Sequence, residues 1–183
     1  MRENAPGEAR CPRNASHWYH DFVKLLSILR HAKSSWKDSS LDDHDRPLNK
    51  RGLRDAPRVG ELLLEKDLVP DTILSSTARR ARETALAVAT AARFPDEVRF
   101  TRDLYLADPG AYVEALRGLP ESCEHAMVVG HNPGIEQLVA LVAGTPEPMP
   151  TAALVVVELD LESWKDLDPP PHGSLRATWR PRD

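Results

Sequence analysis

The chain has 183 residues, of which 41% are hydrophobic and 28% are charged, and its formal net charge is −4. This length predicts a single domain with its own core, and the composition excludes both wholesale disorder and an integral membrane protein. The acidic balance disfavours non-specific binding to nucleic-acid phosphates, so no nucleic-acid partner is expected. Two cysteines, Cys11 and Cys123, are too few for a disulfide scaffold or a four-cysteine zinc site.

Residues 1–20 mix Pro, Gly, Asn and charged residues without periodicity. They are predicted to form a flexible N-terminal tail ahead of one domain over residues 21–183. The tail has no apolar stretch of the kind a secretory signal needs. The longest apolar runs, Leu25–Leu29 and Ala152–Val157, are too short to span a bilayer. We therefore expect a cytoplasmic protein with no membrane partner.

Apolar runs and helical periodicity predict four elements in the first half of the domain. They are a buried strand at Val23–Leu29, a helix over residues 48–66, a strand at Thr72–Ser76 and a helix at Arg79–Ala92. Apolar residues spaced three or four apart predict the inward faces of the two helices. These residues are Leu53, Ala56, Val59 and Leu63 in the first helix, and Ala81, Ala85, Leu86 and Ala89 in the second.

The second half continues the alternation of strands and helices. Its predicted elements are a strand at Val98–Thr101, a helix at Ala111–Leu116, a strand at Ala126–Gly130, a helix at Ile135–Val142, a strand at Thr151–Leu159 and a short edge strand at Leu175–Trp179. Asn132 is expected to cap the helix that opens at Pro133 and closes at Gly144. This order predicts an α/β fold, a three-layer sandwich in which helices flank a mostly parallel central sheet.

Polar residues follow three of the predicted strands, at the sheet edge where ligands bind in open α/β folds. The pair Arg30-His31 ends the first strand, Ser75-Ser76 ends the second ahead of Arg79-Arg80, and Gly130-His131 ends another. If these strands are neighbours, two histidines and at least two arginines converge. A positive spot in an acidic protein indicates an anionic ligand. Arginine donors and the start of a helix both match phosphate oxygens.

These residues also have ordinary interpretations. Either histidine could be a loop residue satisfied at the surface, and one arginine could pair with Glu83. Lys33 and Arg82 are expected near the rim of the positive spot. The segment Asp42–Asp45 offers carboxylates and a histidine, but it lacks metal-ligand spacing and is better explained as a solvated loop. No metal and no cofactor are predicted, and neither a phosphate-binding glycine loop nor a serine-hydrolase elbow is present.

Four segments together resemble the histidine phosphatase superfamily (branch 1), and within it the phosphohistidine phosphatase (SixA-like) family. They are Leu29–Trp36, Asp45–Gly52, Ser76–Thr84 and Val128–Gly134, which occur in the expected order. The similarity runs from about residue 24 to residue 180. In the Arg-His-Gly signature of the superfamily, the third position is Ala32 in this chain. The resemblance implies the phosphoglycerate mutase-like fold.

The resemblance also implies roles for particular residues. His31 corresponds to the nucleophile that becomes a phosphohistidine, and Arg30, Arg80 and His131 correspond to the residues that bind the phosphoryl group. Arg79 and Arg82 fall outside the register of the motif. Lys33 and Ser34 complete the predicted substrate-binding set.

The general acid is where the chain departs from the family pattern. Many members carry a Glu after the third strand, and Asp103–Pro109 contains no clear match. An imidazole leaving group needs less protonation than an alkoxide, so this absence is consistent with a substrate that has an N–P bond. Asp108 is the candidate for an unrecognised acid, and the alternative is that it caps the turn at Pro109-Gly110.

The sequence therefore predicts a metal-independent phosphatase that acts through a phosphohistidine on His31 and removes phosphate from phosphohistidine in proteins. Its partner would be a phosphorylated protein or a small phosphorylated substrate. Two alternatives remain. One is a phosphatase or mutase for small phosphate esters that uses the same site, and the other is a non-catalytic phosphate- or phosphoprotein-binding module. The sequence indicates no particular oligomeric state.

Overall fold

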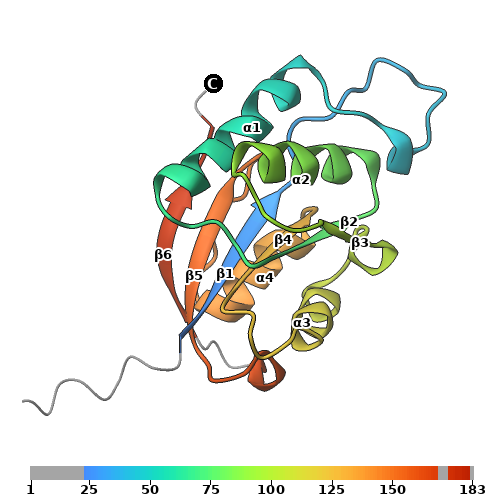
Figure 1. Cartoon of the computed structure of the whole chain (residues 1–183). Coiled ribbons are helices and arrows are strands. Elements are labelled where there is room, and N and C mark those ends of the chain that lie inside the picture. The colour runs from blue at the N-terminus through green and yellow to red at the C-terminus, as the bar shows by residue number, and fades with distance from the viewer. Residues whose placement is uncertain (1–22, 169–172, 182–183) are drawn as a thin grey trace, which may run out of the picture.

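A computed structural model describes residues 23–168 and 173–181, so the predicted tail over residues 1–20 lies outside the described residues. Its centre is a six-stranded sheet in the order β3-β2-β4-β1-β5-β6 (Figure 1). The strands are β1 (Val23–Arg30), β2 (Thr72–Ser76), β3 (Arg99–Thr101), β4 (His125–Gly130), β5 (Leu154–Asp160) and β6 (Gly173–Trp179). Each corresponds to a strand predicted from the sequence.

Helices cover both faces of this sheet. The helices α1 (Lys50–Glu65) and α2 (Arg79–Ala91) lie on one face, and α3 (Pro109–Arg117) and α4 (Gly134–Ala143) lie on the other (Figure 1). In the sheet β1 to β4 are parallel, and β5 runs antiparallel to both of its neighbours, β1 and β6. The predicted three-layer α/β sandwich with a mostly parallel sheet is confirmed. Among the described helices, none is long and apolar enough to cross a bilayer.

The sequence patterns of the central strands explain this layering. All six residues of β4 are buried, and β1 buries Leu26 and Ile28 on one side and Leu29 on the other. A strand covered on both faces needs an apolar run rather than an alternating one, which is the pattern these strands carry. The central position of β1 and β4 follows from their composition.

Helix α1 crosses α2 at close range through small residues. A Cβ atom on Gly60 would lie 2.4 Å from the Val88 carbonyl oxygen and 2.7 Å from the Ala91 Cβ. Two predicted core residues on these helices are wrong, because Leu53 is 59% exposed and Leu86 is 47% exposed. Each lies one residue, or about 100° of helix rotation, beyond a small residue that faces the core. Gly52 packs against the Lys33 backbone and Ala85 is fully buried, so each small residue takes the inward position and the leucine that follows it points outward.

The start of α4 also differs from the prediction. Pro133 occupies the capping position, and the Asn132 amide instead donates to the Met149 carbonyl oxygen at 3.2 Å. Asn132 therefore ties the β4–α4 turn to the loop before β5. The end of α4 is as predicted, because Gly144 adopts a left-handed conformation with φ of 67°.

The strand order brings three carboxyl ends together. Arg30 at the end of β1 is aligned with Gly130 at the end of β4, and Ser75 of β2 is aligned with Val129 of β4. Since β4 lies between β1 and β2, the residues that follow these strands share one edge of the sheet. The strands are neighbours, as the predicted convergence of histidines and arginines requires.

The tight crossing of α1 and α2 predicts that Gly60→Ala destabilises the fold. The added methyl group cannot avoid the Val88 carbonyl without moving a helix, and we expect a loss of about 1–3 kcal/mol in the free energy of unfolding. Urea unfolding measures it, with Glu61→Ala on the exposed side of the same helix as the control. Equal stability of Gly60→Ala and wild type would contradict the packing described here.

Candidate active site

A pocket of about 390 Å³ opens at the shared edge of β1, β2 and β4. It is lined by Arg30, His31, Lys33, Ser34, Trp36, Asp43, Arg46, Arg80, Leu106, His131, Asn132 and Thr151. All six predicted site residues are in this lining. Four of the lining residues are Arg or Lys and one is a carboxylate, so the pocket has an excess of positive charge in a chain whose net charge is −4.

His31 is held in one tautomer. Its side chain is only 7% exposed, and Nδ1 lies 2.8 Å from the Ala32 carbonyl oxygen, which can only accept a hydrogen bond. The proton of the neutral ring is therefore on Nδ1, and Nε2 keeps its lone pair. Burial, with Arg80 and Arg30 nearby, lowers the pKa of His31 to about 3, although the bond to Ala32 opposes this shift. The ring is neutral at ordinary pH.

The backbone around His31 is fixed by Thr84 of α2. Its hydroxyl oxygen accepts from the Ala32 amide at 2.9 Å, and the same hydroxyl donates to the Arg80 carbonyl oxygen at 2.6 Å. One buried side chain thus joins the end of β1 to the first turn of α2. The carbonyl that orients His31 belongs to a residue that is itself anchored.

Arg80 is the arginine of its segment that faces His31. Its Nε lies 3.3 Å from His31 Nε2, and its Nη2 lies 2.9 Å from Asp43 Oδ2. Arg79 instead pairs with Glu83 at 2.8 Å, as one interpretation of the sequence allowed. Arg82 stacks on Phe100, with its guanidinium carbon 4.1 Å from the ring centroid, so the expectation that Arg82 lies near the rim is wrong. Helical geometry points these three side chains in different directions.

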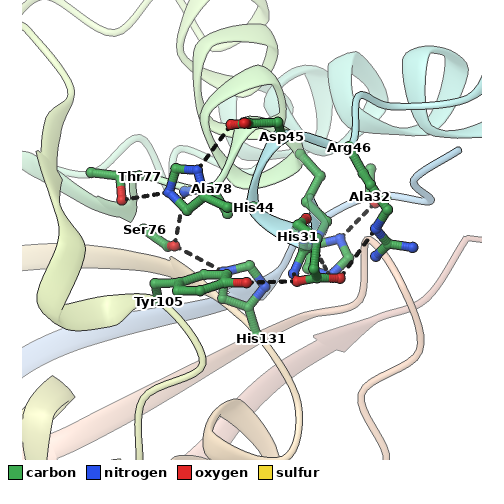
Figure 2. Close-up of polar contacts among 12 residues, drawn as sticks. His31, Ala32, His44, Asp45, Arg46, Ser76, Thr77, Ala78, Tyr105 and His131 are labelled. Carbon is green, nitrogen blue, oxygen red and sulfur yellow. Dashed lines mark hydrogen bonds and ion pairs between the residues drawn. The ribbon is translucent and has the colours of Figure 1, made fainter. Parts of the chain in front are cut away.

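His131 lies beside His31, with 5.0 Å between the ring centroids (Figure 2). Its Nε2 is 2.9 Å from Ser76 Oγ, which also accepts from the Ala78 amide, so the Ser76 hydroxyl proton is available to Nε2. We assign the ring hydrogen to Nδ1, which is buried and has no partner in the structure. Burial, and to a lesser extent His31 and Arg80, lowers the pKa of His131 to about 2.

Asp43 is a site residue that the sequence reasoning did not select. One carboxylate oxygen, Oδ2, accepts from the Tyr105 hydroxyl at 2.8 Å as well as from Arg80, and the other, Oδ1, lies 3.1 Å from Arg46 Nε. Burial acts to raise the pKa of Asp43, but these hydrogen bonds and cations outweigh it, and the pKa is lowered. The sequence predicts a solvated loop for Asp42–Asp45, and for Asp43 this prediction is wrong, because its carboxylate is bound by Arg80, Arg46 and Tyr105. The sequence signal for Asp43 is its position just before Asp45–Gly52, one of the four segments that resemble the histidine phosphatase superfamily.

The remaining predicted residues occupy the wall and the mouth. Arg30 donates through Nη1 to the Met149 carbonyl oxygen at 2.7 Å, Lys33 is exposed at the rim, and Ser34 is buried in the wall. Asp108 is not part of the lining, because its carboxylate accepts from the Ala111 amide at 3.1 Å and caps α3. In the described part of the chain, no group of three His, Cys, Asp or Glu side chains could hold a metal ion.

Several buried donors around the pocket have no acceptor. They are Arg30 Nε, Arg46 Nη1 and His131 Nδ1. Buried polar groups in proteins are almost always paired, so three such donors around one cavity indicate a ligand that brings acceptor oxygens. A tetrahedral oxyanion such as a phosphoryl group has the charge and the acceptors that this arrangement fits.

Comparisons with known proteins agree with this geometry. Residues 26–113 match the family model of the histidine phosphatase superfamily (branch 1). An uncharacterised chloroplastic protein of Arabidopsis thaliana is 35% identical over 152 residues, which cover 78% of this chain and 70% of that protein. An uncharacterised protein of Mycobacterium tuberculosis is 34% identical over 152 residues, covering 77% of this chain and 92% of its own. Among solved structures, a candidate phosphohistidine phosphatase SixA from Nakamurella multipartitia is 26% identical, with a TM-score of 0.74 over 87% of this chain and 96% of that chain.

The role of Thr84 predicts a specific loss of stability in Thr84→Val. The isosteric valine leaves the buried Ala32 amide without an acceptor, and we expect a loss of about 1–3 kcal/mol in the free energy of unfolding. Thr90→Val is the matched control, because Thr90 is also on α2 and also donates to the carbonyl four residues earlier, but it is exposed. Chemical denaturation should leave Thr90→Val within about 0.5 kcal/mol of wild type. Equal effects of the two variants would contradict the anchoring of Ala32.

Proposed function

The chain belongs to the histidine phosphatase superfamily (branch 1), and from this premise we propose that it is a metal-independent phosphatase that removes phosphate from phosphohistidine in proteins. Members of the superfamily are phosphatases and mutases. The observation that carries the proposal is the state of His31. Its neutral ring has its proton on Nδ1 and presents Nε2 to a pocket rich in guanidinium groups. Residues 21–183 would form the single catalytic domain.

In the first step His31 Nε2 attacks phosphorus and forms an N–P bond. The bond from phosphorus to the nitrogen of the substrate imidazole breaks, and the electron pair stays on that nitrogen. Arg30, Arg80 and His131 stabilise the charge on the phosphoryl oxygens, the role that positioned cations and donors have in phosphoryl transfer. In this structure Arg80 Nε donates to His31 Nε2, the attacking nitrogen. With substrate bound, the same N–H group would donate to a phosphoryl oxygen instead.

In the second step water attacks phosphorus in the phosphohistidine at position 31. The N–P bond breaks, inorganic phosphate leaves and neutral His31 is restored. Covalent catalysis of this kind replaces one difficult displacement by two easier ones. Because Nδ1 stays bonded to the Ala32 carbonyl oxygen, the ring can act as nucleophile and leaving group without turning.

The surroundings of the pocket support an N–P substrate over an alkyl phosphate ester. In the segment Asp103–Pro109, the Asp108 carboxylate caps a helix, and the Tyr105 hydroxyl donates to Asp43. Neither is free to protonate a departing oxygen. A leaving imidazole tolerates this lack better than an alkoxide does. Lys33 at the exposed rim and Ser34 would contact the substrate beyond its phosphoryl group.

The nucleophile proposal predicts that His31→Ala loses turnover by roughly 10³-fold or more. Incubation of wild type with phosphorylated substrate, followed by an alkaline quench, should leave the label on His31. His125→Gln is the control. His125 is equally buried, at 7% exposure, but it lies at the start of β4, away from the pocket, where its ring is hydrogen-bonded to Ser27 of β1. Label on another residue, or normal turnover by His31→Ala, would show that His31 is not the nucleophile.

The absent acid predicts a steep dependence of rate on the pKa of the leaving group. Phosphoramidate, phosphohistidine and aryl phosphates should be turned over, and alkyl phosphates should be slower by roughly 10²–10⁴-fold, the usual worth of general acid catalysis. Asp108→Asn should have the same dependence, since asparagine also caps helices well. A flat dependence in wild type that becomes steep in Asp108→Asn would identify Asp108 as an acid.

Metal independence predicts full activity after dialysis against EDTA. The measurement is turnover of an aryl phosphate before and after chelation, with added Mg²⁺ and Zn²⁺ as separate arms. Loss of activity that a divalent ion restores would favour metal-assisted hydrolysis and reject this part of the proposal.

A further inference from the structure

Trp36 is a wall of the pocket that the proposed chemistry does not use. Its side chain lines the same cavity as His31 and is 73% exposed. The guanidinium carbon of Arg46 lies 3.3 Å from the centroid of the indole, so that one face of the ring is covered and the other is open. We propose that Trp36 is a stacking platform for the planar ring that carries the phosphoryl group, so that the site selects phosphate joined to an imidazole or aromatic ring. This rests on the proposed phosphatase function.

The backbone holds Trp36 in this position. Ser34 and Leu48 form an antiparallel bridge, and the Ser35 amide donates to the Pro47 carbonyl oxygen at 2.8 Å. In this antiparallel register Ser35 faces Pro47, and the next pair on the same side as Ser34 and Leu48 is Trp36 and Arg46. Cross-strand neighbours of this kind are in side-chain contact. The stack of guanidinium on indole therefore follows from paired backbone segments rather than from a chance contact of two surface side chains.

Arg46 connects the indole to the phosphoryl end of the pocket. Its Nε is 3.1 Å from Asp43 Oδ1, its side chain is buried, and its Nη1 has no partner. Asp43 in turn holds Arg80, whose Nε is 3.3 Å from His31 Nε2. A phosphoryl group bound by Arg46 and Arg80 would lie next to the guanidinium that backs the indole. The group attached to phosphorus would then lie in the cavity that Trp36 lines.

Leu106 supplies a second apolar wall. It lines the same cavity, is 55% exposed, and has a left-handed backbone with φ of 50°. In the described ranges, five large hydrophobic side chains are exposed, and of these only Trp36 and Leu106 line this pocket. A flat apolar wall beside a cationic cradle matches a ligand with an anionic group on a planar ring. An alkyl phosphate would leave the indole face in water.

Binding of two non-hydrolysable anions tests the platform without any turnover. Phenylphosphonate and methylphosphonate carry the same charged group, and only the first has a ring. We expect calorimetry on wild type to show phenylphosphonate binding tighter by roughly 3- to 10-fold, the worth of one aromatic contact. Trp36→Ala should bind the two equally with unchanged affinity for methylphosphonate, and Trp36→Phe should keep most of the preference. Leu53→Ala, an exposed leucine outside the pocket, is the matched control.

Two results would overturn the platform. They are a wild type without preference for the ring, and a Trp36→Ala variant that keeps the preference. If that variant keeps the preference but binds both phosphonates more weakly to the same degree, Trp36 only orients Arg46. Turnover of phosphohistidine by wild type separates this proposal from the proposed function. A ring preference without turnover would leave the platform standing and reject the phosphatase.

Discussion

The hydrogen bond from His31 Nδ1 to the Ala32 carbonyl oxygen is the interaction on which the site depends. It decides which nitrogen carries the proton, and burial decides that there is only one proton to carry. A ring that was exposed would be partly protonated near neutral pH, and a ring without this bond could present either nitrogen. Thr84 anchors the residue that supplies the carbonyl, and the crossing of α1 and α2 holds the helix that supplies Thr84.

The pocket concentrates positive charge that the rest of the chain lacks. Arg30, Arg46 and Arg80 converge on a cavity with one carboxylate, Asp43, in its lining. Asp43 bridges two of these guanidinium groups and keeps them close together without an anion present. Donors left over on Arg30, Arg46 and His131 are oriented before any ligand arrives, so binding an oxyanion requires little reorganisation. The two neighbouring histidines remain neutral in this field, which keeps a lone pair on His31.

Much of this arrangement could be predicted from the sequence because it depends on local patterns. Apolar runs identify the buried strands, and the polar residues that follow them must lie at one edge when the strands are parallel neighbours. The contribution of Asp43 could not be predicted in this way, because it arises where the η1 turn (Asp43–Asp45) meets Arg80 of α2 and Tyr105 of another loop. The faces of α1 and α2 were also predicted only in part. Hydrophobicity favours Leu53 and Leu86 as core residues, whereas in the structure the small residues before them, Gly52 and Ala85, take the buried positions.

The protonation state of the His31 ring is the most direct test of this account. Nitrogen NMR of ¹⁵N-histidine-labelled protein, with His31→Ala used to assign the signals, reports the protonation of each ring nitrogen between pH 8 and pH 4. Because burial lowers the pKa of His31 to about 3, the account predicts a protonated Nδ1 and an unprotonated Nε2 throughout this range. A ring that titrates near the ordinary value of about 6.5, or one that carries its proton on Nε2, would contradict it.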